Sequence, residues 1–318
     1  MAEPIRPVLL HRNANHRRST EIYSLEDRHV WVREHKDLSP QSWQAPPEFE
    51  RVGKLVFSAG RCHEGKWFHT LEASTSIHPL FQTTLDGADP SLPQLLSDLG
   101  EGAFQFEQTQ QALVQNPVPA VVAFLLGWKS SFDVVEGSVR IRAELVATLG
   151  AEWLKDLEVW YLQETASGSS HGEFSVANIT LSPTGPVVLR DPTSVAAPRG
   201  FDVGWLIGDF IEFALSPLTP FSARDAAEAA RLVRQGYERA ASQTVSPDDQ
   251  ATEKSLKIAA QLRIIYHYVE YRLHPDLDQV HATKALDLIG PEILGEGGSV
   301  LSFVLSGSSN LGGQYHAG

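Results

Sequence analysis

The order of β-prone and helix-prone segments constrains this fold more than any other feature of the sequence. Three short runs, residues 30–33, 54–57 and 66–71, carry β-branched and aromatic side chains, which favour extended strands. Gly60 and Gly65 lie between the second and third runs, where turns are expected. These runs predict a small β-rich region in the first quarter of the chain.

Helix-prone sequence occupies most of the rest of the chain. Between residues 90 and 164, leucines recur three and four positions apart, as on the buried face of a helix. Further helices are predicted at 201–215, 222–241 and 256–273. The second of these starts with Ser222, which is followed three positions later by an acidic residue, the spacing of a capping box.

One β-hairpin interrupts the helices. Residues 178–181 and 186–189 are β-prone and flank a turn-forming stretch, Ser-Pro-Thr-Gly, at 182–185. Such an interlude in a helical region is a natural place to present side chains to a cleft. The order predicts a bilobal α+β fold, with a reduced β-rich N-terminal lobe at 1–73 and a helical C-terminal lobe at 74–318.

The composition is that of a folded chain with an ordinary core. Of 318 residues, 42% are hydrophobic and 20% are charged, which excludes disorder over the whole length. The only cysteine, Cys62, excludes an internal disulfide and a multi-cysteine zinc site. No run approaches the roughly 18 apolar residues of a membrane span, and the N-terminus lacks a signal-peptide pattern. We therefore expect a soluble, cytoplasmic protein with no membrane partner.

The charge balance limits the partners. There are 26 basic and 39 acidic residues, giving a net charge of −13, which argues against nucleic-acid binding. The negative net charge would suit a cationic partner, or it serves solubility alone. Residues 1–20 differ, because they form a basic arm that includes Arg12, Arg17 and Arg18. Such an arm either grips an acidic ligand or is a mobile terminus.

Two motifs match known patterns without the context that the chemistry needs. Residues 60–66 have the G-x-x-x-x-G-K spacing of a phosphate-binding loop, but Trp67 follows where Ser or Thr would hold magnesium. The next residues are β-prone, so a hairpin turn is predicted instead. Residues 168–172 match G-x-S-x-G, yet no helix follows to present the serine. We interpret this match as chance.

A third motif brings together residues suited to phosphoryl transfer. His171, Glu173 and Asn178 have the spacing of the kinase catalytic loop, H-R-D-L-x-x-x-N, and Asp191 follows thirteen positions after the asparagine. In that loop the acidic residue accepts the proton of the acceptor hydroxyl, and the asparagine binds magnesium. A returning strand would deliver Asp191 beside Asn178, and magnesium prefers such oxygen ligands. The catalytic hairpin is therefore predicted to span 170–192.

The segments HGEFSVANITLSPTGPVVLRDP and FDVGWLIGDF resemble the core of aminoglycoside-phosphotransferase-like kinases. The resemblance implies a bilobal, protein-kinase-like fold that uses ATP or another nucleoside triphosphate with magnesium. It assigns the base to Glu173, the orientation of the loop to His171 and the metal to Asn178 and Asp191. Asp202 would brace the loop; a plain helix N-cap is the alternative for this residue.

The segment GPVVLRDPTSVAAPRGFDVGWLIGDFIEF also resembles phosphotransferase subunits of class V lanthipeptide and thioamitide dehydratases, which modify ribosomally made peptides. That resemblance implies Ser or Thr of a precursor peptide as the acceptor. A separate lyase partner would then eliminate the phosphate.

Several positions depart from the family pattern. Glu173 stands where the family usually has Asp, and no glycine precedes Gly53, so the N-terminal lobe lacks a glycine-rich loop over the phosphates. Arg33 occupies the place of the nucleotide-binding lysine, with Glu48 or Glu50 as its expected acidic partner. The leading interpretation is a magnesium-dependent phosphotransferase. The alternatives are an antibiotic kinase of the aminoglycoside type and a pseudokinase that serves as a binding subunit.

Overall fold

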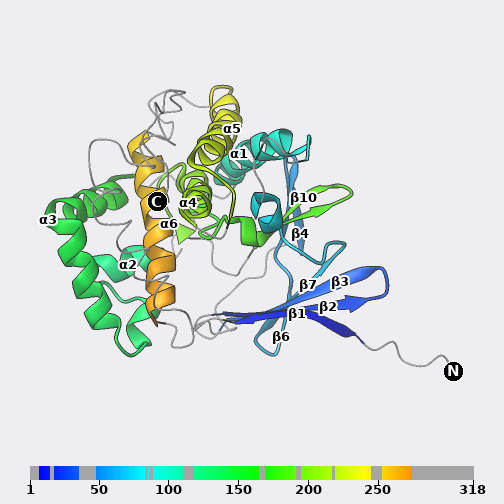
Figure 1. Cartoon of the computed structure of the whole chain (residues 1–318), viewed down its shortest axis with the longest axis horizontal. Coiled ribbons are helices and arrows are strands. Elements are labelled where there is room, and N and C mark those ends of the chain that lie inside the picture. The colour runs from blue at the N-terminus through cyan, green and yellow to red at the C-terminus, as the bar shows by residue number, and fades with distance from the viewer. Residues whose placement is uncertain are drawn as a thin grey trace.

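The computed structural model describes residues 7–14, 18–35, 48–82, 85, 89–109, 118–164, 169–190, 195–216, 219–244 and 253–273. Within these residues, strands dominate the N-terminal part and helices dominate the C-terminal part, as Figure 1 shows. The α+β order predicted from the sequence is therefore confirmed.

The N-terminal part contains an antiparallel sheet of five strands in the order β1-β2-β3-β7-β6. The strands are β1 (Val8–Ala14), β2 (Arg18–Leu25), β3 (Arg28–His35), β6 (Arg61–His63) and β7 (Lys66–Leu71). The turn between β6 and β7 has left-handed backbone at Glu64 and Gly65, with φ of 50° and 79°, which matches the twist of a hairpin. The G-x-x-x-x-G-K match is thus a hairpin turn, as predicted.

The described part of the basic arm is strand rather than mobile terminus. β1 is an exposed edge strand paired with β2, and Arg12 in β1 lies 3.2 Å from the Glu21 carboxylate in β2. Arg18 is the first residue of β2. The expectation of a mobile arm is wrong for these residues, because pairing with β2 orders them. Arg17 lies outside the described residues.

A second sheet joins the predicted hairpin to the N-terminal part of the chain. Its order is β4-β5-β10-β9, with β4 (Phe49–Val52), β5 (Leu55–Ser58), β9 (Ile179–Ser182) and β10 (Gly185–Leu189). The hairpin itself was predicted, but its parallel pairing with β5 was not. β10 is buried at four of five residues, as expected of a strand covered on both faces. Hydrogen bonding thus crosses the predicted lobe boundary between residues 73 and 74, and the position of that boundary stays a prediction.

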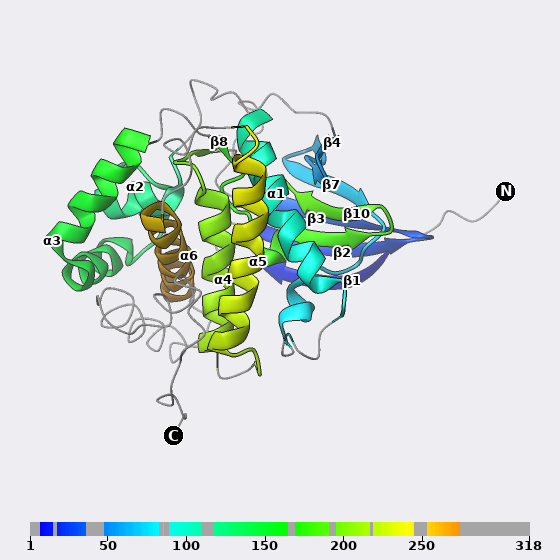
Figure 2. The same ribbon diagram turned by 90° about the horizontal axis from the view of Figure 1, so that it is seen from above.

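Helices form the larger part of the molecule. They are α1 (Leu92–Thr109), α2 (Ala120–Leu126), α3 (Ser138–Glu164), α4 (Phe201–Leu215), α5 (Ala223–Ala241) and α6 (Glu253–Leu273). α4 lies between α5 and α6, and α1 packs on α5, on the side nearer the sheets (Figure 2). The capping box at Ser222 is confirmed, since its hydroxyl accepts from the Asp225 amide and the Asp225 carboxylate accepts from the Ser222 amide.

α4 is the central helix of the core. It is buried from Phe201 to Ile211, and an apolar surface on every side is typical of a helix enclosed by others. Gly204 and Gly208 let α6 approach closely, because a Cβ at Gly204 would lie 2.5 Å from the Ala259 Cβ. The position of α4 is thereby fixed from its first turn onwards.

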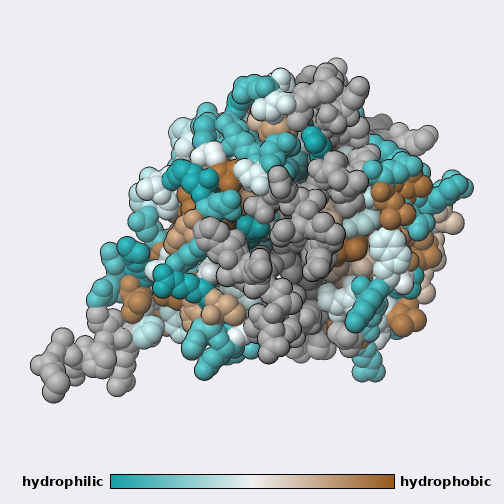
Figure 3. Space-filling view, turned by 180° about the vertical axis from the view of Figure 1, so that it is seen from behind, coloured by the Kyte–Doolittle hydropathy of each residue, from teal (hydrophilic) through white to brown (hydrophobic). Residues whose placement is uncertain are grey.

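One face of the molecule shows how the apolar and hydrophilic side chains of the described residues are distributed. On the face seen in Figure 3, apolar side chains lie in small groups among hydrophilic ones. Among the described residues, no helix combines the length and hydropathy needed to cross a membrane.

The contact between α4 and α6 gives the first testable prediction. Gly204→Ala is expected to destabilise the protein by about 1–3 kcal/mol by overpacking, although alanine alone would favour the helix by about 1 kcal/mol. The measurement is the free energy of unfolding in urea. As a control, Ala147→Leu adds bulk on an exposed face of α3 and should change it by less than about 0.5 kcal/mol. Equal effects of the two substitutions would contradict this account of the packing.

Candidate functional site

The loop from Ser170 to Asn178 is held at its start by Asp202 in the first turn of α4. The Asp202 carboxylate is fully buried and accepts from the Ser170 hydroxyl at 2.5 Å, the His171 amide at 2.8 Å and the Gly172 amide at 3.1 Å. The N-cap of α4 is Gly200. The N-cap alternative for Asp202 is therefore wrong, and its carboxylate binds the loop instead, where the helix dipole favours a negative charge.

The end of the same loop is held by Asp209, which sequence reasoning missed. Asp209 accepts from the Val176 amide at 2.8 Å and from Arg263 Nε of α6 at 2.5 Å, and both side chains are buried. Asp202 and Asp209 are seven residues apart, which places them on one face of a helix. Two carboxylates at that spacing in a mostly apolar helix are the signal that could have found this role.

His171 lies inside the loop and orients it. Its Nε2 lies 3.0 Å from the Leu189 carbonyl oxygen of β10, and its Nδ1 accepts from the Glu173 amide at 3.3 Å. A carbonyl only accepts, so Nε2 carries the proton. The ring is 3% exposed and lies near the rings of Phe57 and Phe106. This geometry fits a positioning residue that ties the loop to β10.

Glu173 is the most accessible of the three motif side chains. Its side chain is 24% exposed, whereas His171 is 3% and Asn178 is 2% exposed. Arg18 Nη1 of β2 donates to Glu173 Oε2 at 3.1 Å. The sequence did not predict this contact, because Arg18 was placed in the basic arm and not over the loop.

Asn178 closes the loop and contacts the N-terminal sheet. Its Nδ2 donates to the Glu173 carbonyl oxygen at 2.7 Å, and its Oδ1 accepts from Arg33 Nη2 at 2.9 Å. Arg33 comes from β3 and is 1% exposed. Arg33, which was predicted to bind the nucleotide, therefore contacts the predicted catalytic loop.

The acidic partners predicted for Arg33 bind other arginines. Glu50 in β4 lies 3.4 Å from Arg190 Nη1, and Glu48 accepts from Arg61 Nε at 2.7 Å. The pairing of Arg33 with Glu48 or Glu50 is thus wrong. Glu50 lies in β4 and Arg190 directly after β10 of the same sheet, whereas Glu48, just before β4, binds Arg61 in β6 of the five-stranded sheet.

The predicted metal site is described only in part. Asp191 lies outside the described residues, so its convergence with Asn178 stays a prediction. Asn178 itself does not fit a magnesium ligand, because its amide oxygen is buried against a guanidinium and its amide nitrogen is bound to the loop. In the described part of the chain, no three acidic, histidine or cysteine side chains gather around a point that would suit a metal ion.

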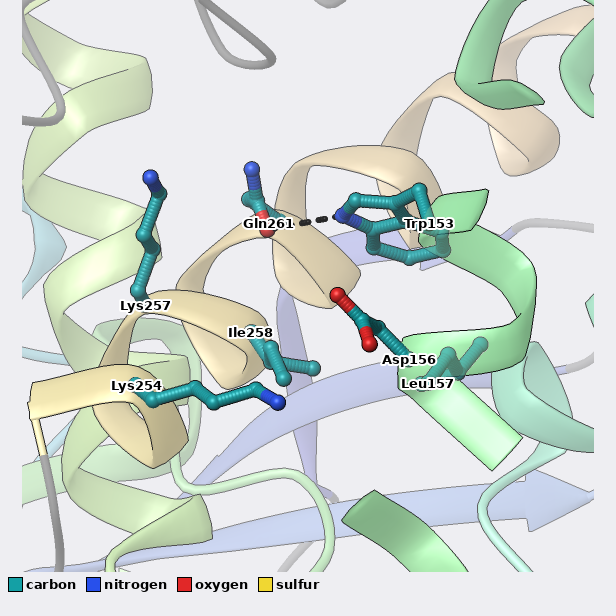
Figure 4. Close-up of a pocket in the computed structure, with 7 residues that line it drawn as sticks. All are labelled: Trp153, Asp156, Leu157, Lys254, Lys257, Ile258 and Gln261. Atoms are coloured by element: carbon teal, nitrogen blue, oxygen red, sulfur yellow. Dashed lines mark hydrogen bonds between the residues drawn. The ribbon is translucent and has the colours of Figure 1, made fainter. Parts of the chain in front are cut away.

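A separate pocket of about 160 Å³ lies between α3 and α6. Figure 4 shows Trp153 donating to Gln261, with Lys254 and Lys257 on the α6 side. Its lining contains no residue of the loop. The pocket is therefore distinct from the candidate site.

Comparison with solved structures establishes the fold around this loop. Choline kinase from Cryptosporidium parvum Iowa II superposes with a TM-score of 0.54 and 11% identity, over 90% of this chain and 88% of that chain. The chain has a kinase-like fold. A spectinomycin phosphotransferase solved with ADP and spectinomycin superposes with a TM-score of 0.48 and 8% identity, over 95% of this chain and 93% of that chain. No family model and no curated protein matches the sequence.

The similarity to choline kinase confirms the bilobal α+β architecture that the family resemblance implied. The narrower resemblance to lanthipeptide and thioamitide dehydratase subunits concerns the acceptor rather than the fold.

A buried acid beneath the loop gives a pH-dependent prediction. Glu107 of α1 accepts from the Gly200 amide at 3.0 Å and the Tyr237 hydroxyl at 2.8 Å. Burial, and secondarily the nearby Asp202 charge, raise the pKa of Glu107 to about 8. The folded protein therefore keeps a proton that the unfolded chain releases above about pH 4.3. The stabilisation that comes from keeping Glu107 protonated is complete below about pH 4.3. It is lost as the pH rises through about 8, the pKa of Glu107 in the folded protein.

Glu107→Gln should remove this dependence, because glutamine is neutral and can bind both partners. Relative to the variant, the unfolding free energy of the wild type should fall by up to about 1.4 kcal/mol per pH unit between about pH 5 and 8. Urea unfolding across this range is the measurement. Glu64→Gln, at an exposed side chain, should keep the wild-type slope. Parallel curves for Glu107→Gln and the wild type would show that Glu107 is charged in the folded protein.

Proposed function

We propose that this protein transfers the γ-phosphate of ATP, or of another nucleoside triphosphate with its magnesium ion, to a hydroxyl group. The observation that carries the proposal is the loop held by Asp202 at its start and by Asp209 at its end, with Glu173 accessible between them. Phosphoryl transfer needs positioned groups more than covalent chemistry from the protein. A loop anchored at two points supplies such positioning.

Glu173 is the proposed general base. The acceptor oxygen bonds to the γ-phosphorus, the bond from that phosphorus to the β,γ-bridging oxygen breaks, and the hydroxyl proton passes to the Glu173 carboxylate. Arg18, at 3.1 Å, holds the carboxylate in one orientation. Glutamate carries one methylene more than the usual aspartate, and its anchoring matters because a displacement of about 1 Å can cost about 10²-fold in rate.

The proposed acceptor is Ser or Thr of a ribosomally made precursor peptide, with elimination of the phosphate by a partner lyase. The resemblance over 185–213 to lanthipeptide and thioamitide phosphotransferase subunits supports it. The alternative acceptor is a cationic small molecule such as an aminoglycoside, which the net charge of −13 would suit.

A pseudokinase is the second candidate function, and one contact favours it. The amide oxygen of Asn178, which would bind magnesium in the family, is held by Arg33. A chain with this contact that binds no nucleotide would act as a binding subunit.

The test is a transfer assay read by mass spectrometry. The protein is incubated with ATP, magnesium and either a precursor-type peptide or an aminoglycoside, and a gain of one phosphate is sought on each. Glu173→Gln should lower turnover by about 10²–10⁴-fold, whereas Glu34→Gln, on an exposed position of β3, should not change it. Unchanged turnover in Glu173→Gln would mean that Glu173 is not the base.

A second arm of the assay separates the acceptors. Adding the lyase should raise peptide modification if the protein works with this partner. Full phosphorylation of the small molecule, with no gain from a lyase, would assign the antibiotic-kinase function. No phosphate transfer and no nucleotide binding would assign the pseudokinase.

A further inference from the structure

One contact in the loop departs from what the family resemblance implies. The Asn178 amide oxygen lies 2.9 Å from Arg33 Nη2, and both residues are almost completely buried. A metal ligand needs an oxygen that a cation can approach. Here a cationic side chain already lies against that oxygen.

A divalent ion on the same oxygen would be close to the arginine. A magnesium–oxygen bond of about 2.1 Å, added to the 2.9 Å contact, places the two cations at most about 5 Å apart. Like charges at that range repel strongly, and burial weakens the screening that water would give. Arg33 and a metal therefore compete for Asn178.

The packing of the N-terminal sheet holds Arg33 against Asn178 before any ligand binds. In the sheet, Arg33 pairs with Thr20 of β2 and Trp67 of β7. Trp31, two residues earlier and thus on the same face of β3, is buried with Val187 and Leu189 of β10. This cluster fixes the inner face of the sheet against the strand that leads back to the loop. Arg33 is therefore held at Asn178 by packed neighbours on both flanking strands.

Other arginines lie around the same loop. Arg18 binds Glu173, and Arg190, the residue after β10, lies over the Phe106 ring at 5.1 Å and binds Glu50. Guanidinium groups are well suited to phosphate, which they bind through paired donors. Arginine side chains thus lie around this loop, and one of them, Arg33, contacts the asparagine at which the family resemblance implies a metal ion.

We propose that the guanidinium of Arg33 takes the place of a metal ion at Asn178, so that an arginine neutralises a nucleoside polyphosphate on this side of the site. The choice of ligand rests on the proposed function; the replacement of the metal by Arg33 does not. A metal ion that binds elsewhere together with the nucleotide would not have Asn178 as a ligand.

The first test counts bound manganese. Mn²⁺ is titrated against the protein with a non-hydrolysable ATP analogue, and free Mn²⁺ is followed by electron paramagnetic resonance. Asn178→Ala should bind as many ions as the wild type with the same affinity. Loss of an ion, or an affinity weaker by about tenfold or more, in a variant that is still folded at the assay temperature would overturn the proposal.

The second test measures nucleotide affinity in EDTA. Arg33→Met should weaken binding of the analogue by about tenfold or more, which corresponds to about 1.4 kcal/mol, and added magnesium should restore part of the loss. Arg61→Met removes the exposed pair with Glu48 in the same sheet and should bind like the wild type. Equal affinities of Arg33→Met and the wild type in EDTA would overturn the proposal.

A third measurement needs no nucleotide and separates this proposal from the proposed function. The melting temperatures of Arg33→Met, Asn178→Ala and the double variant are compared in EDTA. A direct contact predicts that the double variant loses less than the sum of the single losses. Additive losses would overturn the proposal. If the wild type binds no nucleotide, the proposed function fails and this cycle alone decides whether Arg33 holds Asn178.

Discussion

The candidate site depends on two buried carboxylates that project from one helix to one loop. Asp202 binds the loop at His171 and Gly172, and Asp209 binds it at Val176. Neither carboxylate is solvated, so each is stable only while its donors are in place. Asp209 has a further partner in Arg263 of α6, which ties the loop to the packing of the helical core. The loop is therefore held in place by α4. Glu173 lies between the two attachment points, so the position of α4 determines the position of Glu173.

The N-terminal sheet closes over the loop from the other side through two arginines. Arg18 binds the accessible carboxylate and Arg33 binds the buried amide. The second sheet also contacts the loop, because β10, which pairs with β5, binds His171 through the Leu189 carbonyl oxygen. A kinase-like fold that lacks a glycine-rich loop before Gly53 thus contacts its predicted catalytic loop with long cationic side chains. This arrangement is compatible with phosphoryl transfer, in which opposing cations stabilise the transferred group.

Local patterns predicted α4, α5, α6 and the hairpin of β9 and β10, but they missed strand β1 and the contacts between distant strands. The limits of α4 and the cap at Ser222 follow from helical periodicity and capping chemistry, which act within a few residues. The pairing of β5 with β10 joins segments about 130 residues apart and leaves no local signal. Glu50 was expected, with Glu48 as the alternative, to pair with Arg33, but it binds Arg190, which follows β10. Asp209 was missed, although its seven-residue spacing from Asp202 places both carboxylates on one face of α4.

Amide hydrogen exchange at Gly172 and Val176 tests most directly whether α4 holds the loop. Both amides donate to buried carboxylates, so they should exchange as slowly as amides in the core of α4. Asp202→Asn should accelerate exchange at Gly172 and leave Val176 protected, and Asp209→Asn should do the reverse. Exchange of both amides in the wild-type protein at the rate of an exposed loop would contradict the account.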